Sequence, residues 1–362
     1  MKLMFVGKRH PQQRDLIERP YGRFHHLPVE LAALGHEVRV ALCSHRNLPT
    51  AESAMGGVHW TNHDIRTLGW RALLRRIDEA AAEFRPDWVI GISDAQYGWL
   101  ARRIAIRQRA ALALDAYDDF EAYSPWNLPL HWLWRRAVRD AGLVTAAGPQ
   151  LAALLHRHRR DGAKVDVLPM AADPEFVPRE RAACRAALGL PTDAPLIGYI
   201  GSWGSNRGTR MLLDAFRIAR DQRPALRLVL SGRPPAQALA QPGVIGVGYV
   251  ADEQLPLLVA ALDVACVVTA DTRFGRGSYP AKLCEAVACK VPVAATATEP
   301  VRWMLGNRGA HLADVADAPG YARCILGLLD SGANDYPPQA TWPEVAQQYD
   351  VMLRRHPTRR LP

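Results

Sequence analysis

Short apolar runs alternate with longer amphipathic segments along most of the chain. In the first half, the apolar runs predict strands at residues 2–6, 37–42, 88–92, 111–115, 143–146 and 165–168. Between them, apolar residues recur at helical spacing and predict helices at residues 24–35, 69–84, 96–107, 130–140 and 149–157. Strand–helix alternation of this kind is typical of a parallel sheet with helices on both faces.

A proline-rich stretch interrupts this pattern before it starts again. Residues 169–195 contain five prolines around one short helical segment, which indicates a linker between domains. Beyond it, strands are predicted at residues 196–200, 226–230, 244–248, 264–268 and 291–295. Helices are predicted at residues 209–222, 252–262, 281–289, 301–305, 319–329 and 343–354. We therefore expect two doubly wound α/β domains, with ligands bound beyond the carboxyl ends of strands in a cleft between them.

The composition supports a globular protein and narrows its class. The 362 residues suffice for about two domains, and 49% hydrophobic with 22% charged residues is an ordinary globular balance. The six cysteines form no C-x-x-C pair, so a reducing cytoplasm is the expected compartment. The apolar runs are too short to predict a signal peptide or a membrane span. The usual motifs of P-loop ATPases, dinucleotide-binding proteins, zinc proteases and α/β-hydrolases are absent from the sequence.

The loop after the predicted strand at 196–200 is the first candidate binding site. It leads into the helix at 209–222 and contains Gly201, Ser202, Trp203, Asn206 and Arg207. Small residues let the backbone approach a ligand, and the free N–H groups of a helix start suit phosphate. An arginine adds donors that match phosphate oxygens. The alternative is an ordinary glycine-rich turn with a solvated arginine.

A second glycine-containing loop enters the helix at 281–289. Its candidate residues are Gly277, Ser278, Tyr279, Pro280, Ala281, Lys282 and Glu285. Proline suits the first turn of a helix. A carboxylate one turn into the helix could accept two hydroxyl hydrogen bonds of the kind that ribose offers, or it could compensate the helix dipole. The lysine is either a phosphate ligand or a surface residue.

Two further candidates lie in the first half of the chain. Gly22 precedes a predicted helix start, which is another terminus suited to an anion. The adjacent His25 and His26 would point about 100° apart on a helix and therefore do not form a metal pair. Asp115 and Asp118 follow an apolar strand and are either a substrate or base site or a loop with capping aspartates. We expect no metal there.

Several stretches in the same order resemble the retaining nucleotide-sugar glycosyltransferases of the GT-B fold, in particular the large family 4. They begin with a helix followed by Gly-His-Glu-Val at residues 31–40 and a proline-containing linker at 165–178. A strand with a basic–Gly turn and a helix follows at 197–216, and a further turn and helix at 248–264. The last two are a donor-site helix at 280–293 and a closing helix at 341–346. The resemblance implies two Rossmann-like domains that face each other across a cleft. These would be an acceptor-side domain at residues 1–170, a nucleotide-sugar domain at 171–340, and a C-terminal helix at 341–362 that returns to the first domain.

The resemblance also implies roles for individual residues. The second domain would hold a nucleoside-diphosphate sugar, with Arg207 on the diphosphate and Glu285 on the ribose hydroxyls. Tyr279, Pro280 and Ala281 would offer backbone groups near the phosphates and the sugar. In this family, basic side chains and helix ends stabilise the departing nucleoside diphosphate, so neither a metal nor another cofactor is expected.

Three positions depart from the pattern of the family. The family commonly has Glu-x7-Glu, and the first of these acids, usually linked to the donor sugar, is Gly277 here. Ser202 stands for the usual arginine and Arg207 for the usual lysine. Many members have a histidine after the fourth strand, where this chain has Asp115 and Asp118.

The leading hypothesis is transfer of a sugar from a nucleoside-diphosphate sugar to a hydroxyl acceptor with retained configuration. The acceptor would be a glycan, a lipid-linked glycan or a small natural product. Arg207 would stabilise the leaving phosphate, and Asp115 or Asp118 would orient the acceptor or the sugar. Gly277 motivates the alternative, a catalytically silent GT-B protein that binds a sugar nucleotide or a partner protein.

The charge of the chain adds one expectation about its surroundings. Lys and Arg number 45 against 36 Asp and Glu, which gives a formal net charge of +9. The excess lies mainly in the first 170 residues, with arginine clusters at 102–109, 135–139 and 156–160. If these clusters face one side, they favour peripheral contact with an anionic membrane from the cytoplasm. A coding bias toward arginine is the alternative, and no recognition helix, zinc module or aromatic–basic interleaving supports nucleic-acid binding.

Overall fold

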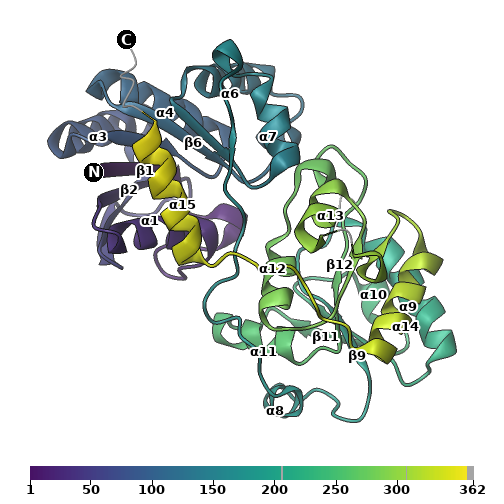
Figure 1. Ribbon diagram of the computed structural model, residues 1–362. Helices are drawn as coiled ribbons and strands as arrows, with labels where there is room; N and C mark the ends of the chain where they lie inside the picture. Colours follow the sequence, from purple (N-terminus) through teal and green to yellow (C-terminus); the bar gives the residue numbers. More distant parts are fainter. Residues whose placement is uncertain (205–206, 307, 357–362) are drawn as a thin grey trace. The chain divides into compact units, whose positions relative to one another are not determined.

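The computed structural model describes residues 1–204, 207–306 and 308–356. The chain divides into two compact units (Figure 1). Unit 1 comprises Met1–Met170 together with the C-terminal segment that starts at Ala340, and unit 2 comprises Ala171–Gln339. Each unit is built on a sheet of its own, so that each has its own layers and its own core.

The sheet of unit 1 has eight strands among the described residues, in the order β3-β4-β2-β1-β5-β6-β7-β8. The strands are β1 (Lys2–Lys8), β2 (Glu37–Ser44), β3 (Ala51–Met55), β4 (Val58–Asp64), β5 (Trp88–Gly91), β6 (Ala111–Ala116), β7 (Leu143–Ala146) and β8 (Asp166–Val167). The helices are α1 (Gly22–Ala33), α2 (Ile65–Leu68), α3 (Trp70–Phe84), α4 (Ala95–Gln108), α5 (Phe120–Tyr123), α6 (Leu128–Asp140), α7 (Pro149–His156) and α15 (Trp342–Arg355). The strands β5, β6 and β7 are buried along their whole length, as expected of a parallel sheet covered on both faces.

The hairpin of β3 and β4 is missing from the prediction made from sequence. Its strands are antiparallel, and Gly56 and Gly57 form its turn with φ angles of 58° and 73°. Two glycines at positive φ suit a tight hairpin turn. In β3 half-buried and exposed positions alternate, with none fully buried, so this edge strand lacks the apolar run that marks the other strands.

Unit 2 has six parallel strands among the described residues, in the order β11-β10-β9-β12-β13-β14. They are β9 (Leu196–Tyr199), β10 (Arg227–Ser231), β11 (Val244–Gly248), β12 (Val264–Val267), β13 (Val293–Thr296) and β14 (Leu312–Ala313). The helices are α8 (Arg181–Ala187), α9 (Thr209–Gln222), α10 (Ala236–Leu239), α11 (Leu255–Ala260), α12 (Ala281–Ala288), α13 (Glu299–Leu305) and α14 (Ala318–Ser331). The two sheets confirm the predicted class of two doubly wound α/β domains.

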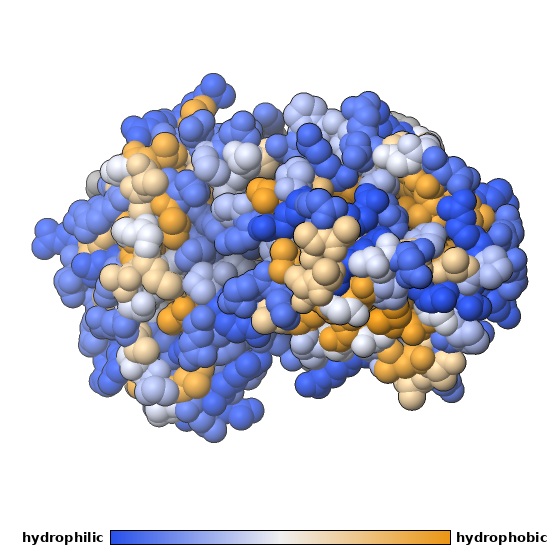
Figure 2. All heavy atoms as spheres, turned by 90° about the horizontal axis from the view of Figure 1, so that it is seen from below, coloured by the Kyte–Doolittle hydropathy of each residue, from blue (hydrophilic) through white to orange (hydrophobic). Residues whose placement is uncertain are grey.

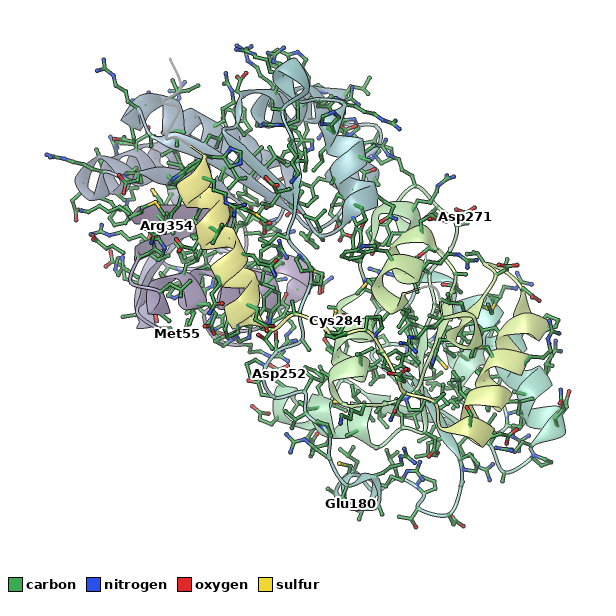
Figure 3. The ribbon with its side chains drawn as sticks, viewed as in Figure 1. Met55, Glu180, Asp252, Asp271, Cys284 and Arg354 are labelled. Atoms are coloured by element: carbon green, nitrogen blue, oxygen red, sulfur yellow. The ribbon has the colours of Figure 1, made fainter. Side chains whose placement is uncertain are left out.

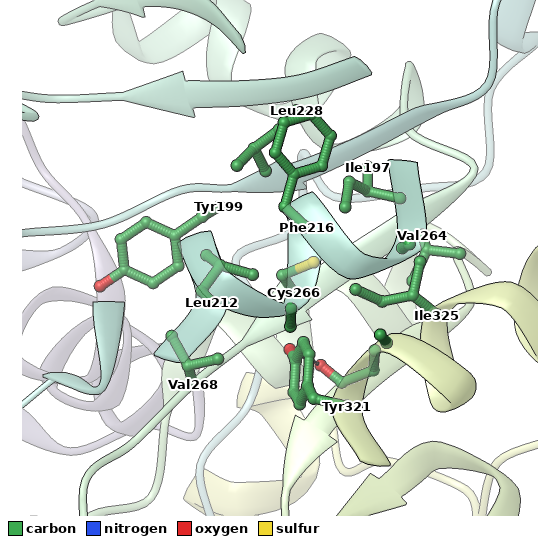
Figure 4. Packing of buried hydrophobic residues seen from close by; sticks show 14 of the residues in the cluster. Ile197, Tyr199, Leu212, Phe216, Leu228, Val264, Cys266, Val268, Tyr321 and Ile325 are labelled. Carbon is green, nitrogen blue, oxygen red and sulfur yellow. Dashed lines mark hydrogen bonds between the residues drawn. The ribbon is translucent and has the colours of Figure 1, made fainter. Parts of the chain in front are cut away.

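The core of unit 2 lies where α9 and α14 pack on the sheet (Figure 4). Leu212 and Phe216 of α9 and Ile325 of α14 belong to one buried cluster with the side chains of the strands. The hydroxyl of Tyr321, which is fully buried there, donates to the carbonyl oxygen of Ala294 at 2.6 Å. The helical spacing of the apolar residues in α9 thus produces one buried stripe against the sheet.

Helix α15 belongs to unit 1, although it follows unit 2 in the sequence. It packs against α1 (Figure 1). Thr341 and Glu344 form a capping box at its start. The ring of Trp342 stacks on His26 with the ring centres 5.8 Å apart, and His36 Nε2 lies 2.8 Å from an oxygen of Asp350.

Two helix starts in unit 2 differ from the prediction for local reasons. The segment predicted as one helix at 252–262 consists of a 3-10 turn, Asp252–Gln254, followed by α11. Pro256 lies in the first turn of α11, where a missing backbone N–H costs nothing. Pro280 has an extended backbone (φ −69°, ψ 116°), so it caps α12 from outside and is not part of its first turn.

One face of the surface is mostly hydrophilic. On the face seen in Figure 2, hydrophilic residues predominate and apolar residues are interspersed among them. Among the described residues, no helix is both long enough and apolar enough to cross a bilayer.

Candidate functional site

The strands β9 and β12 are neighbours in unit 2, but the chain leaves them toward opposite edges of the sheet. The loops that follow them therefore diverge at a topological switch point, the place where open α/β sheets bind ligands. A Cβ atom on Gly208 would lie 3.4 Å from the carbonyl carbon of Thr269 and 3.5 Å from the nitrogen of Ala270. The two loops thus touch, and Gly208 adopts a φ of +70° that glycine tolerates best.

Arg207 lies at this contact. It is half-buried, and its guanidinium carbon lies 4.9 Å from the ring centre of Phe274, which belongs to the loop after β12. The backbone N–H of Arg207 donates to the carbonyl oxygen of Gly204 at 3.0 Å. No carboxylate among the described residues forms an ion pair with Arg207, so its charge is available to an anion at the start of α9.

The loop after β12 is folded tightly on itself. A Cβ atom on Gly275 would clash with the carbonyl oxygen of Ala270 and would lie 2.8 Å from the Thr269 methyl group. The hydroxyl of Thr296 joins the ends of β12 and β13, because it accepts from the N–H of Thr269 at 2.8 Å and donates to the carbonyl oxygen of Thr269 at 3.1 Å. These hydrogen bonds anchor the start of the loop that carries Phe274.

Glu285 and Lys282 form an ion pair on the first turns of α12. The ammonium nitrogen of Lys282 lies 3.1 and 2.9 Å from the two oxygens of the Glu285 carboxylate, which is almost buried. Figure 3 shows the neighbouring Cys284 on this helix. Glu285 is the fifth residue of α12, beyond the four N–H groups that lack partners, so pairing with Lys282 accounts for its position better than dipole compensation does. The remaining lone pairs of the carboxylate can accept hydroxyl groups.

The other predicted residues of this loop are mostly buried. Gly277 ends a 3-10 turn, η5 (Gly275–Gly277), and its N–H donates to the carbonyl oxygen of Phe274 at 3.1 Å. Ser278 is buried, and the ring of Tyr279 packs edge-on against Trp303 with the ring centres 5.9 Å apart. Their side chains therefore shape the loop, while its backbone borders the start of α12.

The loop after β9 brings together only part of the predicted set. Gly201 borders the ring of Tyr199, whose hydroxyl donates to the carbonyl oxygen of Ser202 at 2.8 Å. The side chain of Ser202 is exposed, whereas the ring of Trp203 packs edge-on against Tyr199 at the border of the core. Asn206 lies outside the described residues.

Asp115 has a different place from the one that we expected of a substrate-orienting acid. Its carboxylate is fully buried and accepts two hydrogen bonds of 2.7 Å from Arg23, together with one of 2.7 Å from the hydroxyl of Thr145. Gly22, with a φ of +62°, starts α1 immediately before Arg23. The carboxylate of Asp115 thus forms a buried ion pair between α1 and the sheet.

Asp118 lies after the carboxyl end of β6, as predicted, but it is also buried. One of its carboxylate oxygens accepts from the hydroxyl of Tyr123 at 2.5 Å. Tyr123 lies at the end of α5, and its hydroxyl also lies 3.1 Å from that of Tyr117. Burial raises the pKa of the Tyr117 hydroxyl, and the charges of Asp118 and Asp94 raise it further.

A second switch point, which was not predicted from the sequence, lies between β1 and β5 of unit 1. The backbone N–H of Lys8 donates to the hydroxyl of Ser93 at 3.0 Å, and the Lys8 ammonium lies 3.5 Å from a carboxylate oxygen of Asp94. Burial raises the pKa of the Asp94 carboxyl, and Lys8 opposes this shift. Asp94 follows a buried strand and precedes α4, so the rule that singled out Asp115 would also have found it.

The described residues contain no group of three or more His, Cys, Asp or Glu side chains that could hold a metal ion. Asp15, a buried acid near the end of β1, is engaged by Arg9 at 2.8 Å and by His10 Nε2 at 3.1 Å. The chemistry that these loops offer is therefore that of arginine, lysine, helix starts and paired carboxylates.

The chain has two doubly wound units, and unit 2 carries Arg207 and the paired carboxylate of Glu285 in the loops and helix that follow its switch-point strands. This arrangement is that of a GT-B-like protein. Sucrose-phosphate synthase from Thermosynechococcus elongatus has a similar fold, with a TM-score of 0.76 over 98% of each chain at 18% identity. Anabaena HepE in complex with UDP-glucose matches with a TM-score of 0.71 at 15% identity, over 98% of this chain and 95% of that chain.

Sequence comparison identifies the family. Residues 194–331 match the family of glycosyl transferases group 1, and residues 23–171 match the glycosyl transferase 4-like domain. The chain therefore belongs to the group 1 family of glycosyltransferases, as the sequence motifs indicated.

Curated relatives carry the name D-inositol 3-phosphate glycosyltransferase. The one from Mycobacterium avium is 29% identical over 274 residues, which is 68% of this chain and 60% of the relative. The one from Stackebrandtia nassauensis is 30% identical over 244 residues, 58% of this chain and 53% of the relative. The chain thus spans three fifths or less of the length of these two relatives.

Proposed function

We propose that this protein transfers a glycosyl group from a nucleoside-diphosphate sugar to a hydroxyl acceptor, with retention of configuration and without a metal. The observation that carries the proposal is the contact of Arg207 with Phe274 at the β9–β12 switch point. The same loop leads from Phe274 into α12 and its pair of Lys282 and Glu285. A cation and a carboxylate are the two groups that a nucleoside diphosphate needs, the first for phosphate and the second for ribose.

Arg207 would stabilise the diphosphate as it leaves. The ring of Phe274 holds the guanidinium in place, and a preoriented cation stabilises developing charge without reorganisation. Backbone N–H groups at the start of α9 would add partial positive charge on the same oxygens. Together they would take the place that a divalent cation has in other transferases.

Glu285 would accept hydrogen bonds from the two ribose hydroxyls. Lys282 fixes the direction of the carboxylate, because its ammonium group contacts both oxygens. The acceptor hydroxyl would attack from the face that the diphosphate leaves, so the departing phosphate can take the proton and no protein nucleophile is required.

The acceptor side would lie on unit 1. Lys8 and Asp94 at the β1–β5 switch point form an ion pair that is partly accessible, and Asp118 follows the neighbouring β6. Their hydrogen-bonding groups suit a polyhydroxyl acceptor, which includes glycans, lipid-linked glycans and small polyols. The relatives named for D-inositol 3-phosphate make that compound the first acceptor to test, and UDP-glucose, named with HepE, the first donor.

A transfer assay tests the proposal. The purified protein is incubated with UDP-glucose and other nucleotide sugars, with a panel of acceptors, in the presence of EDTA. We expect release of the nucleoside diphosphate and an axial anomeric product by proton NMR. Glu285→Gln should weaken nucleotide binding. An absence of binding for every nucleotide sugar, measured by calorimetry, would contradict the proposal.

The alternative function is binding of a sugar nucleotide without turnover. It is favoured by one observation, that the position of the first family acid is Gly277, buried in the η5 turn and without a side chain for the donor sugar. Under this alternative the protein binds UDP-glucose with ordinary affinity, yet no acceptor releases UDP above the rate in buffer.

A further inference from the structure

The outer face of α6 in unit 1 has an unusual composition. Its exposed residues recur at helical spacing and form a single stripe, namely Leu128, Pro129, Trp132, Arg135, Arg136 and Arg139. The opposite side of the helix is buried through His131, Trp134, Ala137 and Val138. The stripe, here called the α6 face, is apolar at the N-terminal end of the helix and basic at its C-terminal end.

The apolar end exposes large side chains to water. Trp126, just before the helix, is 78% exposed, Leu128 is 69% exposed and Trp132 is 59% exposed. Single exposed apolar residues need no explanation, but two tryptophans and a leucine within seven residues mark a contact surface. Tryptophan is the residue that lies most readily at the level of lipid headgroups, where one edge is apolar and the other wet.

The basic end presents arginines whose acidic partners are turned inward. Arg135 binds Glu121 at 2.6 Å and Arg139 lies 3.6 Å from Asp140, and both acids have side chains that are nearly buried. Arg136 lies 5.4 Å from the ring centre of Trp132. The α6 face therefore displays positive charge with no exposed carboxylate of its own.

Three of the other arginines that we expected on a membrane-facing side, Arg102, Arg103 and Arg159, form contacts within the fold. Arg102 binds Asp140 at 2.7 Å, and Arg103 binds Asp78 at 2.6 Å. Arg159 donates to the carbonyl oxygens of Val138 and Ala141 at the end of α6. Arg107, Arg109, Arg157 and Arg160 remain exposed, so the α6 face differs from them by the large apolar side chains beside its arginines and not by charge alone.

We propose that the α6 face, together with Trp126 just before it, binds the surface of an anionic lipid bilayer, with the indole rings of Trp126 and Trp132 at headgroup level and the arginines on lipid phosphates. Charge complementarity favours this occupant over a second copy of the chain, which would bring two rows of arginines together without counterions. An amphipathic face with aromatic residues and arginines is the composition of interfacial helices. The surface belongs to unit 1 and the donor loops belong to unit 2, so the proposal is independent of glycosyl transfer.

Vesicle sedimentation tests the proposal on the full chain. Wild-type protein is mixed with vesicles of phosphatidylcholine alone or with 30% phosphatidylglycerol, at low and at physiological salt. We expect binding to the anionic vesicles that weakens as salt rises. Each arginine removed from the face should lower the partition coefficient about fivefold. The variant W132A/R136A should therefore lose at least tenfold.

A matched pair on the same unit supplies the control. Trp70 and Arg71 on α3 are exposed and lie outside the α6 face, so W70A/R71A should bind the vesicles like wild type. Circular dichroism and urea denaturation check that both variants are folded, and R136A/R139A replaces the first variant if it is not. The proposal would be overturned if W132A/R136A and W70A/R71A lost vesicle binding equally, or if wild type bound neutral vesicles as strongly as anionic ones. It would also be overturned if wild type were a dimer that W132A/R136A dissociates.

Discussion

Arg23 and Asp115 form a bidentate ion pair in which the side chains are shielded from solvent, with exposed fractions of 2% and 0%. Arg23 also donates to the carbonyl oxygen of Pro169 at 2.9 Å, and Thr145 donates to Asp115. The pair thus connects the start of α1 to the carboxyl ends of β6 and β7. Through Pro169 it also connects α1 to the end of the segment Met1–Met170.

Removing one partner of this pair should destabilise unit 1 strongly. We expect Asp115→Ala to lower the free energy of unfolding by about 3–5 kcal/mol, because it leaves the Arg23 charge buried without a counterion. Urea denaturation measures the effect, with Asp119→Ala, a helix-cap variant, as a milder comparison of about 1 kcal/mol. If Asp115→Ala has the stability of wild type but no transfer activity, Asp115 has a role in substrate binding instead.

Gly275 should be needed for the shape of the loop after β12. In Gly275→Ala the new Cβ would meet the carbonyl oxygen of Ala270, which is backbone and cannot rotate away. We expect the loop with Phe274 to shift and the transfer rate to fall by roughly 100-fold, as misplaced groups do at active sites. Gly309→Ala, where a Cβ would have nothing within 4 Å, is the control. Steady-state kinetics compares the two, and an equal rate in both would contradict the assignment of the loop.

Acid should destabilise unit 1 through His63. Burial lowers the pKa of this histidine to about 4, and neither ring nitrogen has a hydrogen-bond partner among the described atoms. The unfolded chain binds the proton near pH 6.5 and the folded one only near pH 4, so stability falls as the pH decreases between these values, by at most about 3 kcal/mol.

His63→Leu should flatten this part of the pH profile, whereas His45→Leu, at an exposed position, should leave it as in wild type. Urea midpoints at pH 7, 5.5 and 4.5 measure the slopes. The same acid sensitivity in wild type and His63→Leu would show that other groups titrate in this range.

Much of the fold was predictable because buried parallel strands are apolar along their whole length. β6 and β7 are examples, since every position in each is buried. The edge strand β3 was not predictable from apolar runs, because the sheet buries none of its residues fully. Its only strong signal was the Gly56–Gly57 turn.

The site was predictable to the level of loops and less so to the level of side chains. Arg207 and Glu285 could be placed at loop–helix junctions, since strand ends and helix starts are visible in the sequence. The partners of buried acids were not visible, because Asp115 and Arg23 are 92 residues apart in the chain and meet only in the folded sheet. For the same reason, the pairing of Lys8 with Asp94 was missed.

We propose that Arg207 binds the diphosphate of the donor at the β9–β12 switch point. Calorimetric titration of UDP into wild type, Arg207→Ala and Arg217→Ala provides the test, because Arg217 is an exposed arginine in the middle of α9, away from the helix start. A charge-assisted hydrogen bond contributes about 1.5–3 kcal/mol, so Arg207→Ala should raise the Kd of UDP roughly 10- to 100-fold and Arg217→Ala should change it less than about twofold. Equal affinities of the two variants, or a wild-type protein that does not bind UDP or any other nucleoside diphosphate, would contradict the account.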